Sequence, residues 1–450
     1  MNLYPLLCAR REPIRVLVVG CGKFATMFLA QAKHMANIHV AAIAELNVDR
    51  ARSNLVKAGW PADRLAATDL DRALDDGTTL IGDDALNLID AGRFDVVVEA
   101  TGDPAAGYRH ADRALDAGAH VIMVNVETDV CVGPVLAAKA EAKDRVYAFA
   151  YGDQPALIAE LVDWARVCGF EVAAAGKGTR YLPAFHRSTP ETVWDNLGFS
   201  KAFAENAGMN PKMFNSFVDG TKSAIEMAAV ANATGLQPQI KGLGFPPCGS
   251  DDLPLILRPE TDGGVLEHKG TVEVVADLER DGRPVTNHLR WGVYVTFEAP
   301  SDYAAACFKE YGLLPKGEHG LINGPDRYAA LCRPFHLIGL ELGVSVAQAA
   351  LKQTATGCTR GFSADVVATA KRPLEAGEVL DGEGGYLVYG RLTTAADSLA
   401  KRALPLGLAK DVTLVRPIAR DAIITRDDVR LDPNEPLVAA RAAMEKRFSK

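Results

Sequence analysis

Residues 18–25 have the sequence Val18-Val19-Gly20-Cys21-Gly22-Lys23-Phe24-Ala25, a G-x-G-x-x-A pattern that follows an apolar run and opens a segment with helical spacing. Gly20 permits a tight turn, Gly22 lets the backbone approach a pyrophosphate, and Ala25 lets the helix and the strand pack closely. Free backbone N–H groups at the start of such a helix attract phosphate. The stretch therefore predicts a dinucleotide-binding turn.

The first third of the chain alternates two periodicities. Apolar runs without in–out alternation, which are typical of strands buried on both faces, lie at residues 15–19, 40–44, 94–100, 120–124 and 146–150. Between or after them come segments with helical spacing, at residues 25–34, 49–58, 105–117, 134–143 and 154–168. Strand and helix in succession predict an α/β protein whose residues 1–175 form a Rossmann-type domain with a parallel sheet.

Further residues are expected to complete the cofactor site. Glu45 ends the second apolar run, where an acid grips the adenine ribose and favours NAD, whereas Arg50 could favour the 2′-phosphate of NADP. Both NADPH and NAD(H) therefore stay open. The small residues of Thr101-Gly102 follow the fourth strand and would let the nicotinamide end of the cofactor lie against the backbone. The expected contacts are Gly20, Gly22, Lys23, Phe24, Glu45, Arg50, Thr101 and Gly102.

A largely apolar segment, residues 211–234, predicts one long helix in the middle of the chain. On that helix, spacings of four, three and four would place one polar stripe of Asn215, Asp219, Lys222 and Glu226. A polar stripe on a buried helix needs partners or a wet pocket, which makes Asp219 and Lys222 candidates for proton transfer or enolate stabilisation. The alternative is a solvent-facing stripe with an ion pair between Lys222 and Glu226.

A basic cluster precedes this helix. Lys177 stands between two glycines on a predicted exposed loop, from which it can point into a cleft. Arg180, His186 and Arg187 follow, and they would supply the positive field for a substrate phosphate or carboxylate. A mobile basic surface loop is the alternative interpretation.

The remaining patterns predict two more domains. Residues 176–360 indicate an α+β substrate domain, in which residues 271–278 and 285–297 would form a hairpin around Asp281-Gly282. Residues 361–450 indicate a small β-rich module, because short strands lie among turn signals. Alternating charges with helical spacing at residues 437–448 predict a surface helix.

Composition narrows the range of partners. The 450 residues include 49 basic and 57 acidic side chains, a net charge of -8 that disfavours binding to nucleic acid or to an anionic membrane surface. The eight cysteines form no C-x-x-C pair, and we expect a cytoplasmic protein. No spacing typical of metal ligands stands out. A divalent cation shared by Asp153, Asp219 and Glu226 is a hypothesis, and the metal ligands stay unknown.

Two resemblances follow from these motifs. Residues 20–25 and 95–102 resemble the nucleotide domain of homoserine dehydrogenases. Nearly the whole chain resembles a group of homoserine-dehydrogenase-like oxidoreductases with a C-terminal SAF module. The motifs that carry this second resemblance are Gly176-Lys177-Gly178-Thr179, Asn210-Pro211-Lys212-Met213-Phe214-Asn215-Ser216-Phe217, Asp219-Gly220-Thr221-Lys222 and residues 370–378. One branch of the group is the 1-deoxy-D-xylulose 5-phosphate reductoisomerase-like enzymes.

The resemblance implies an NAD(P)H-dependent reductoisomerase that makes 2-C-methyl-D-erythritol 4-phosphate for isoprenoid synthesis from a small phosphorylated ketose. Lys177 and Lys222 would then stabilise the enediolate and Asp219 would move a proton. Arg180, His186 and Arg187 would anchor the phosphate, with Asn215 as a further substrate contact, and a divalent metal could replace a lysine. The alternatives are a dehydrogenase of a small hydroxy acid or sugar acid, and a non-catalytic cofactor-binding protein. A homodimer or higher homo-oligomer is expected.

Overall fold

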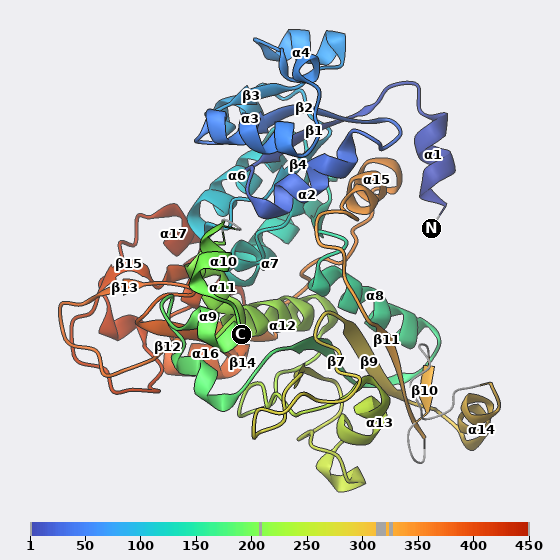
Figure 1. The fold of residues 1–450 in the computed structure, drawn as a ribbon, viewed down its shortest axis with the longest axis vertical. Coiled ribbons are helices and arrows are strands. Elements are labelled where there is room, and N and C mark those ends of the chain that lie inside the picture. Colours follow the sequence, from blue (N-terminus) through green and yellow to red (C-terminus); the bar gives the residue numbers. More distant parts are fainter. Residues whose placement is uncertain (1, 207–208, 312–320, 324–326, 449–450) are drawn as a thin grey trace. The chain divides into compact units, whose positions relative to one another are not determined.

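The structure is a computed structural model that describes residues 2–206, 209–311, 321–323 and 327–448 (Figure 1). The chain divides into two compact units. The first unit comprises Met1–Leu157 and Leu337–Thr359, and the second comprises Ile158–His336 and Arg360–Lys450. The three domains expected from the sequence stay a prediction.

The first unit contains a parallel sheet of six strands, in the order β3-β2-β1-β4-β5-β6. The strands are β1 (Ile14–Val19), β2 (Ile38–Ala44), β3 (Leu80–Gly82), β4 (Val96–Glu99), β5 (His120–Met123) and β6 (Tyr147–Phe149). Five of them confirm the apolar runs, whereas the three-residue β3 was missed. Chain order reverses between β1 and β4, and ligands bind at such a switch point in open α/β sheets.

Helices flank this sheet. The α-helices are α1 (Leu3–Ala9), α2 (Lys23–Ala32), α3 (Val48–Lys57), α4 (Leu70–Asp76), α5 (Ala85–Asp90), α6 (Pro104–Asp116), α7 (Val126–Ala142) and α15 (Gly343–Lys352), with the 3-10 helix η1 (Ala62–Leu65). In the core, Val16 and Val18 of β1 pack with Phe28 and Leu29 of α2, and Val346 of α15 joins them. Residues 337–359 therefore return to complete the core of the first unit.

The second unit contains a mixed sheet of five strands in the order β10-β11-β9-β7-β8. The strands are β7 (Glu171–Thr179), β8 (Thr271–Ala276), β9 (Val293–Glu298), β10 (Leu321–Asn323) and β11 (Tyr328–Arg333). The predicted hairpin forms only at its turn, where Leu278 and Pro284 form an antiparallel bridge. Beyond the turn the prediction is wrong, because β7 lies between β8 and β9 and pairs with both. A tight turn does form at the predicted place, with Gly282 N–H donating to the Glu279 carbonyl at 2.9 Å.

The prediction of one continuous helix over residues 211–234 is also wrong. Two helices, α11 (Pro211–Val218) and α12 (Thr221–Thr234), meet at Asp219 and Gly220, because Gly220 has a left-handed φ of 86°. The single stripe inferred from one continuous helix therefore does not exist. The other helices are α8 (Gln154–Val167), α9 (Val193–Leu197), α10 (Lys201–Asn206), α13 (Leu253–Ile256) and α14 (Asp302–Glu310), with η2 (Pro183–Arg187), η3 (Ser250–Asp252) and η4 (Glu260–Asp262).

The C-terminal segment is β-rich, as predicted. Two antiparallel pairs form, β12 (Ala364–Ala370) with β14 (Val388–Thr394) and β13 (Val379–Asp381) with β15 (Lys410–Thr413). The segment also holds α16 (Ala395–Lys401), η5 (Leu406–Leu408), η6 (Arg426–Asp428) and α17 (Pro436–Phe448). The predicted surface helix matches α17, but Leu437, Arg441 and Met444 are buried on one side of it.

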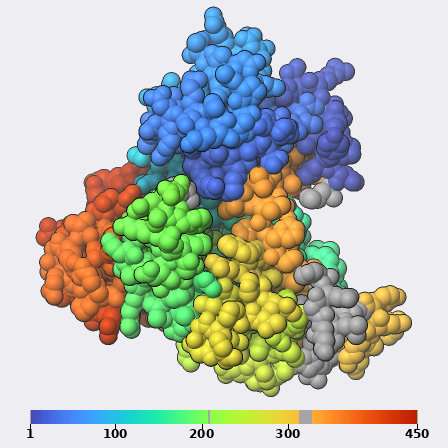
Figure 2. All heavy atoms as spheres, viewed as in Figure 1, coloured from blue at the N-terminus to red at the C-terminus, as the bar shows by residue number. Residues whose placement is uncertain are grey.

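The C-terminal segment packs within the second unit. In Figure 2 its orange residues lie directly against the green segment that contains α9 to α11. Asn215 of α11 donates a hydrogen bond to the Gly384 carbonyl at 2.9 Å, and Gly390 N–H donates to Thr221 Oγ1 at 2.8 Å. Among the described residues, no helix has the length and the apolar character that a membrane crossing requires.

Candidate functional site

The turn after β1 has the geometry that a pyrophosphate needs. Gly20 has φ 91°, and a Cβ there would lie 2.8 Å from the Ala100 carbonyl oxygen, so only glycine fits. Gly22 is the N-cap of α2, supplies no capping side chain, and a Cβ there would have no atom within 4 Å. The first N–H groups of a helix lack partners inside that helix. The turn therefore leaves open space in front of backbone donors.

Glu45 holds this turn in place. One carboxylate oxygen accepts the Cys21 N–H at 2.8 Å, and the other accepts Arg50 Nη2 at 2.8 Å and the Asn47 N–H at 3.2 Å. Burial raises the pKa of the Cys21 thiol to about 11, so this thiol stays protonated. The ion pair between Glu45 and Arg50 partly compensates the charge of each. Their roles at the adenine ribose stay predictions, and the choice between NAD and NADP stays open.

A polar network lies where β4 and β5 end, and the sequence pattern did not predict most of it. Glu99 is fully buried, and its Oε1 accepts Thr101 Oγ1–H at 2.6 Å and lies 3.2 Å from His110 Nδ1. Asn125, the N-cap of α7, lies 3.3 Å from Thr101 Oγ1. Among the described residues, Glu99 Oε2 has no hydrogen-bond partner. A glutamate at the end of an apolar run was the available signal.

These residues fit a dinucleotide. The Gly20–Gly22 turn would take the pyrophosphate, and Thr101 and Gly102 are exposed at the carboxyl end of β4, where the sequence places the nicotinamide. Lys23 is exposed and Phe24 half-buried at the start of α2. When bound, the nicotinamide ring would donate or accept a hydride.

In the second unit, Lys177 lies in a strand and not in an exposed loop. It belongs to β7, is 4% exposed, and its Nζ forms an ion pair with Glu226 Oε2 of α12. The flanking glycines serve close packing, because a Cβ at Gly176 would lie 1.8 Å from the Glu273 carbonyl oxygen and one at Gly178 would lie 2.0 Å from that of Leu289. The predicted exposed loop is therefore wrong.

Asp219 has a partner that sequence reasoning missed. Its Oδ2 lies 2.7 Å from Lys371 Nζ, and both side chains are buried. Lys371 also donates to the carbonyls of Ser188 and Gly385, each at 2.7 Å. Burial raises the pKa of Asp219, while Lys371 acts against that rise. Lys371 belongs to the Lys-Arg-Pro stretch of the C-terminal segment, which was noted only as part of the SAF-like pattern.

His186 lies beside Gly220 in a ring cluster. Its Nδ1 donates to the Asp219 carbonyl at 2.8 Å, and its Nε2 lies 2.9 Å from the Tyr181 hydroxyl. The His186 ring stacks on Tyr389 at 4.7 Å, and Tyr181 stacks on Phe245 at 3.9 Å. Burial lowers the pKa of His186 and raises that of Tyr181 to about 12, so both are neutral near pH 7.

The other predicted substrate residues are not gathered around His186 by any described contact. Arg180 Nε lies 3.5 Å from the buried Asp277, which Arg290 also approaches at 3.7 Å. Burial raises the pKa of Asp277, and the arginines oppose that rise. Arg187 is exposed and Lys222 is half-buried. Asn215 is buried, and it donates to the Ser188 carbonyl at 3.0 Å as well as to Gly384.

No metal centre emerges from the described residues. Within residues 2–448 and outside the gaps given above, no three His, Cys, Asp or Glu side chains are grouped to hold a metal ion. Of the acids proposed to share a cation, Asp219 and Glu226 each form an ion pair with a lysine.

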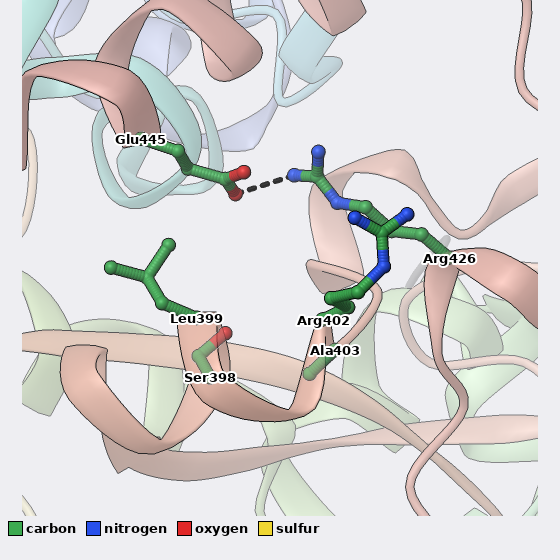
Figure 3. A pocket seen from close by; sticks show the side chains of 6 residues that line it. All are labelled: Ser398, Leu399, Arg402, Ala403, Arg426 and Glu445. Carbon is green, nitrogen blue, oxygen red and sulfur yellow. Dashed lines mark hydrogen bonds and ion pairs between the residues drawn. The ribbon is translucent and has the colours of Figure 1, made fainter. Parts of the chain in front are cut away.

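A hollow of about 180 Å³ lies in the C-terminal segment (Figure 3). Arg402, Arg426 and Glu445 line it together with Ser398, and Figure 3 shows the Glu445 carboxylate bound to Arg426. Arg402 pairs with Asp427 at 3.0 Å. Because a carboxylate compensates each arginine, this hollow carries little net charge.

Comparison with known proteins gives one family. Residues 152–342 match the model described as "Oxidoreductase DRL, catalytic domain". This stretch includes Lys177, His186, Asp219 and Glu226. No curated protein matches the sequence.

Several solved structures are similar to parts of this chain. A scyllo-inositol dehydrogenase from Lactobacillus casei has 12% identity and a TM-score of 0.37 over 78% of this chain and 91% of that chain. A myo-inositol dehydrogenase from the same organism, solved with NAD(H) and myo-inositol, has 13% identity and a TM-score of 0.28 over 40% of this chain and 50% of its own. KijD10, a 3-ketoreductase from Actinomadura kijaniata solved with NADP, has 21% identity and a TM-score of 0.26 over 38% and 50%.

The aligned part of this chain spans half the length of the last two structures, and these weak similarities assign no function. The family match reaches further, because it concerns a catalytic domain. Together with the dinucleotide turn of the first unit, it supports an NAD(P)-dependent oxidoreductase whose residues 152–342 are similar to the catalytic domain of the DRL oxidoreductases.

Proposed function

We propose that this chain is an NAD(P)-dependent dehydrogenase or reductase of a small hydroxy or keto compound that carries an anionic group. The observation that carries the proposal is the pair of His186 and Tyr181, whose polar atoms lie 2.9 Å apart. Both residues belong to the segment that matches an oxidoreductase catalytic domain, and His186 lines a pocket. The nucleotide turn of the first unit supports the same reaction class.

The hydrogen bonds of His186 determine where its proton lies. A carbonyl oxygen can only accept, so the contact with Asp219 fixes a proton on Nδ1 and leaves Nε2 as an acceptor. Tyr181 then donates its hydroxyl proton to Nε2. Reduction of a carbonyl requires a proton at the substrate oxygen, and oxidation of an alcohol releases one. We assign that proton transfer to the Tyr181–His186 pair.

This assignment places the dehydrogenase alternative ahead of the reductoisomerase reaction. Lys177 and Asp219, which the rearrangement would use, have their charges compensated in buried ion pairs. Conversion of 1-deoxy-D-xylulose 5-phosphate is the second, more specific candidate reaction. The sequence resemblance supports it, as does the presence of Lys222 on α12. We also propose that residues 361–450 act as an SAF-like module and that the protein forms a homo-oligomer.

The test is a substrate panel with the purified 450-residue protein. Cofactor absorbance is followed with NADPH, NADH and their oxidised forms against anionic hydroxy and keto acids, phosphorylated ketoses and their neutral analogues. We expect turnover on an anionic compound and little on its neutral analogue. A deoxyxylulose phosphate arm, with and without magnesium or manganese, tests the rearrangement. Cofactor binding without turnover on any compound would instead support the non-catalytic alternative.

A further inference from the structure

A pocket of about 160 Å³ opens in the second unit beside Gly220. Segments far apart in the sequence line it. Lys241 and Phe245 come from the loop between α12 and η3, Tyr389 and Arg391 come from β14, and His186 comes from η2. The pocket therefore combines two cationic side chains with three aromatic rings.

The two cations of this pocket are not compensated by an ion pair among the described residues. Lys241 is exposed, and Arg391 is half-buried with its Nη2 3.4 Å from the Lys241 carbonyl oxygen. Two acids act nearby, because Asp219 and Asp421 both raise the pKa values of His186 and Tyr389, whereas Arg391 lowers both. Asp219 is itself paired with Lys371. The pocket thus differs from the hollow between Arg402 and Arg426, where each arginine has a carboxylate partner.

The wall that carries Lys241 and Phe245 is fixed by the buried Glu273 of β8. Its carboxylate accepts the N–H groups of Gly244 at 2.9 Å and Phe245 at 3.2 Å, and also accepts from Gln239 Nε2. Phe245 has φ 48°, an unfavourable conformation for a bulky residue. Such a conformation persists only where the surroundings impose it, and it is frequent at ligand sites. The hydrogen bonds to Glu273 therefore hold this loop in one particular conformation.

We propose that this pocket binds the anionic group of the substrate, a carboxylate or a phosphate monoester, through Lys241 and Arg391. The rings of His186, Phe245 and Tyr389 cover the adjoining carbon atoms. The identification of the bound molecule as the substrate rests on the proposed function. The oxyanion site itself is inferred from the geometry of the pocket. Charge-assisted hydrogen bonds from lysine and arginine are the usual means of holding such groups.

The test measures protection of one lysine. The 450-residue protein, without cofactor or substrate, is treated with an amine-acetylating reagent, and the modification rates of Lys241 and of the exposed Lys401 are read by mass spectrometry. Inorganic phosphate or acetate is added in a concentration series at an ionic strength kept constant with potassium chloride. We expect one of these anions to slow modification of Lys241 in a saturable way and to leave Lys401 unaffected. Phosphate acting alone identifies a phosphate monoester, and acetate acting alone identifies a carboxylate.

Variants make the test specific to the pocket. Arg391→Ala should raise the concentration for half-protection about tenfold or more, since a hydrogen bond to a charged group contributes that much. Arg72→Ala, which removes an exposed arginine of the first unit, should change nothing. Equal rates with and without both anions, or unchanged protection in Arg391→Ala, would overturn the proposal. Because no turnover is measured, this result is independent of the substrate panel.

Discussion

The ammonium group of Lys371 lies 2.7 Å from the carboxylate of Asp219, and this buried ion pair joins the C-terminal segment to the junction of α11 and α12. Removing one partner of a buried pair leaves the other charge without compensation. We expect Lys371→Met to destabilise the second unit by about 3–5 kcal/mol, as measured by urea unfolding.

Two further variants calibrate this effect. Asp219→Asn combined with Lys371→Met should recover part of the lost stability. Lys401→Met removes an exposed partner of Asp397 and should cost no more than about 1 kcal/mol. A Lys371→Met protein as stable as Lys401→Met would show that the buried pair contributes nothing.

The contrast between Asp219 and the glycine turn explains what the sequence could predict. The dinucleotide turn is local, because the strand, the glycines and the helix follow one another directly in the sequence, and five of the six strands of the sheet follow from repetition of that pattern. Lys371 is remote in sequence from Asp219, and no periodicity links a lysine in a turn-rich tail to one particular aspartate. A buried position for Asp219 was one of the two interpretations of the polar stripe, whereas its partner required the fold.

Two wrong predictions have physical causes of the same kind. Gly-Lys-Gly favours a loop on local grounds, but Gly176 and Gly178 allow the backbones of Glu273 and Leu289 to approach β7. The apolar helical pattern around Gly220 predicted one helix, but the left-handed φ of 86° at Gly220 separates α11 from α12. In both cases tertiary packing, which local propensity does not describe, decided the structure.

The ion pair of Lys177 and Glu226 offers a test of the predicted catalytic lysine. Because both side chains are buried, we expect the double variant Lys177→Met with Glu226→Leu to be about as stable as the wild type, since apolar residues can replace such a pair. If the pair is structural, turnover on the substrate found in the panel should also persist. Retained stability with a loss of kcat of about 100-fold or more would instead support a catalytic Lys177.

Asp129 should make the stability of the first unit depend on pH. It is fully buried, accepts hydrogen bonds from Tyr147 at 2.9 Å and Thr359 at 2.8 Å, and burial raises its pKa from 3.8 to about 7. Between about pH 4 and pH 7, Asp129 therefore keeps its proton in the folded state but has lost it in the unfolded state. Stability from this group is full below pH 4 and falls as the pH rises to about 7, by up to about 4 kcal/mol.

Thermal unfolding across this pH range measures the effect. Asp129→Asn should flatten the part of the profile that Asp129 causes, whereas Asp75→Asn, at an exposed position of α4, should leave the profile as in the wild type. A parallel decline in the wild type and Asp129→Asn would contradict the assignment.

Glu273 should affect the oxyanion pocket without touching the cofactor. In Glu273→Gln, an amide NH2 would replace one oxygen that now accepts N–H groups of the loop that carries Lys241. We expect the concentration of anion for half-protection of Lys241 to rise several-fold, while the Kd for NADPH stays unchanged. Glu267→Gln is the matched control, because Glu267 is exposed and accepts the Ile240 N–H of the same loop at 2.7 Å. An equal effect of the two variants would argue against a specific role for Glu273.

Gly20 and Gly22 separate the folding role of the dinucleotide turn from its binding role. Gly20→Ala places a Cβ 2.8 Å from the Ala100 carbonyl oxygen at φ 91°, so we expect the first unit to lose about 1–3 kcal/mol of stability. Gly22 has φ -77° and open space around its Cα, so the melting temperature of Gly22→Ala should stay close to that of the wild type.

The methyl group added in Gly22→Ala would nevertheless occupy the path of the pyrophosphate, and the Kd values for NADPH and NADH should rise about tenfold or more. Fluorescence titration with both reduced cofactors provides the measurement. Because Gly22→Ala leaves the fold intact, wild-type affinity in this variant for whichever cofactor binds would mean that the pyrophosphate lies elsewhere, and the proposed oxidoreductase would lose its cofactor site.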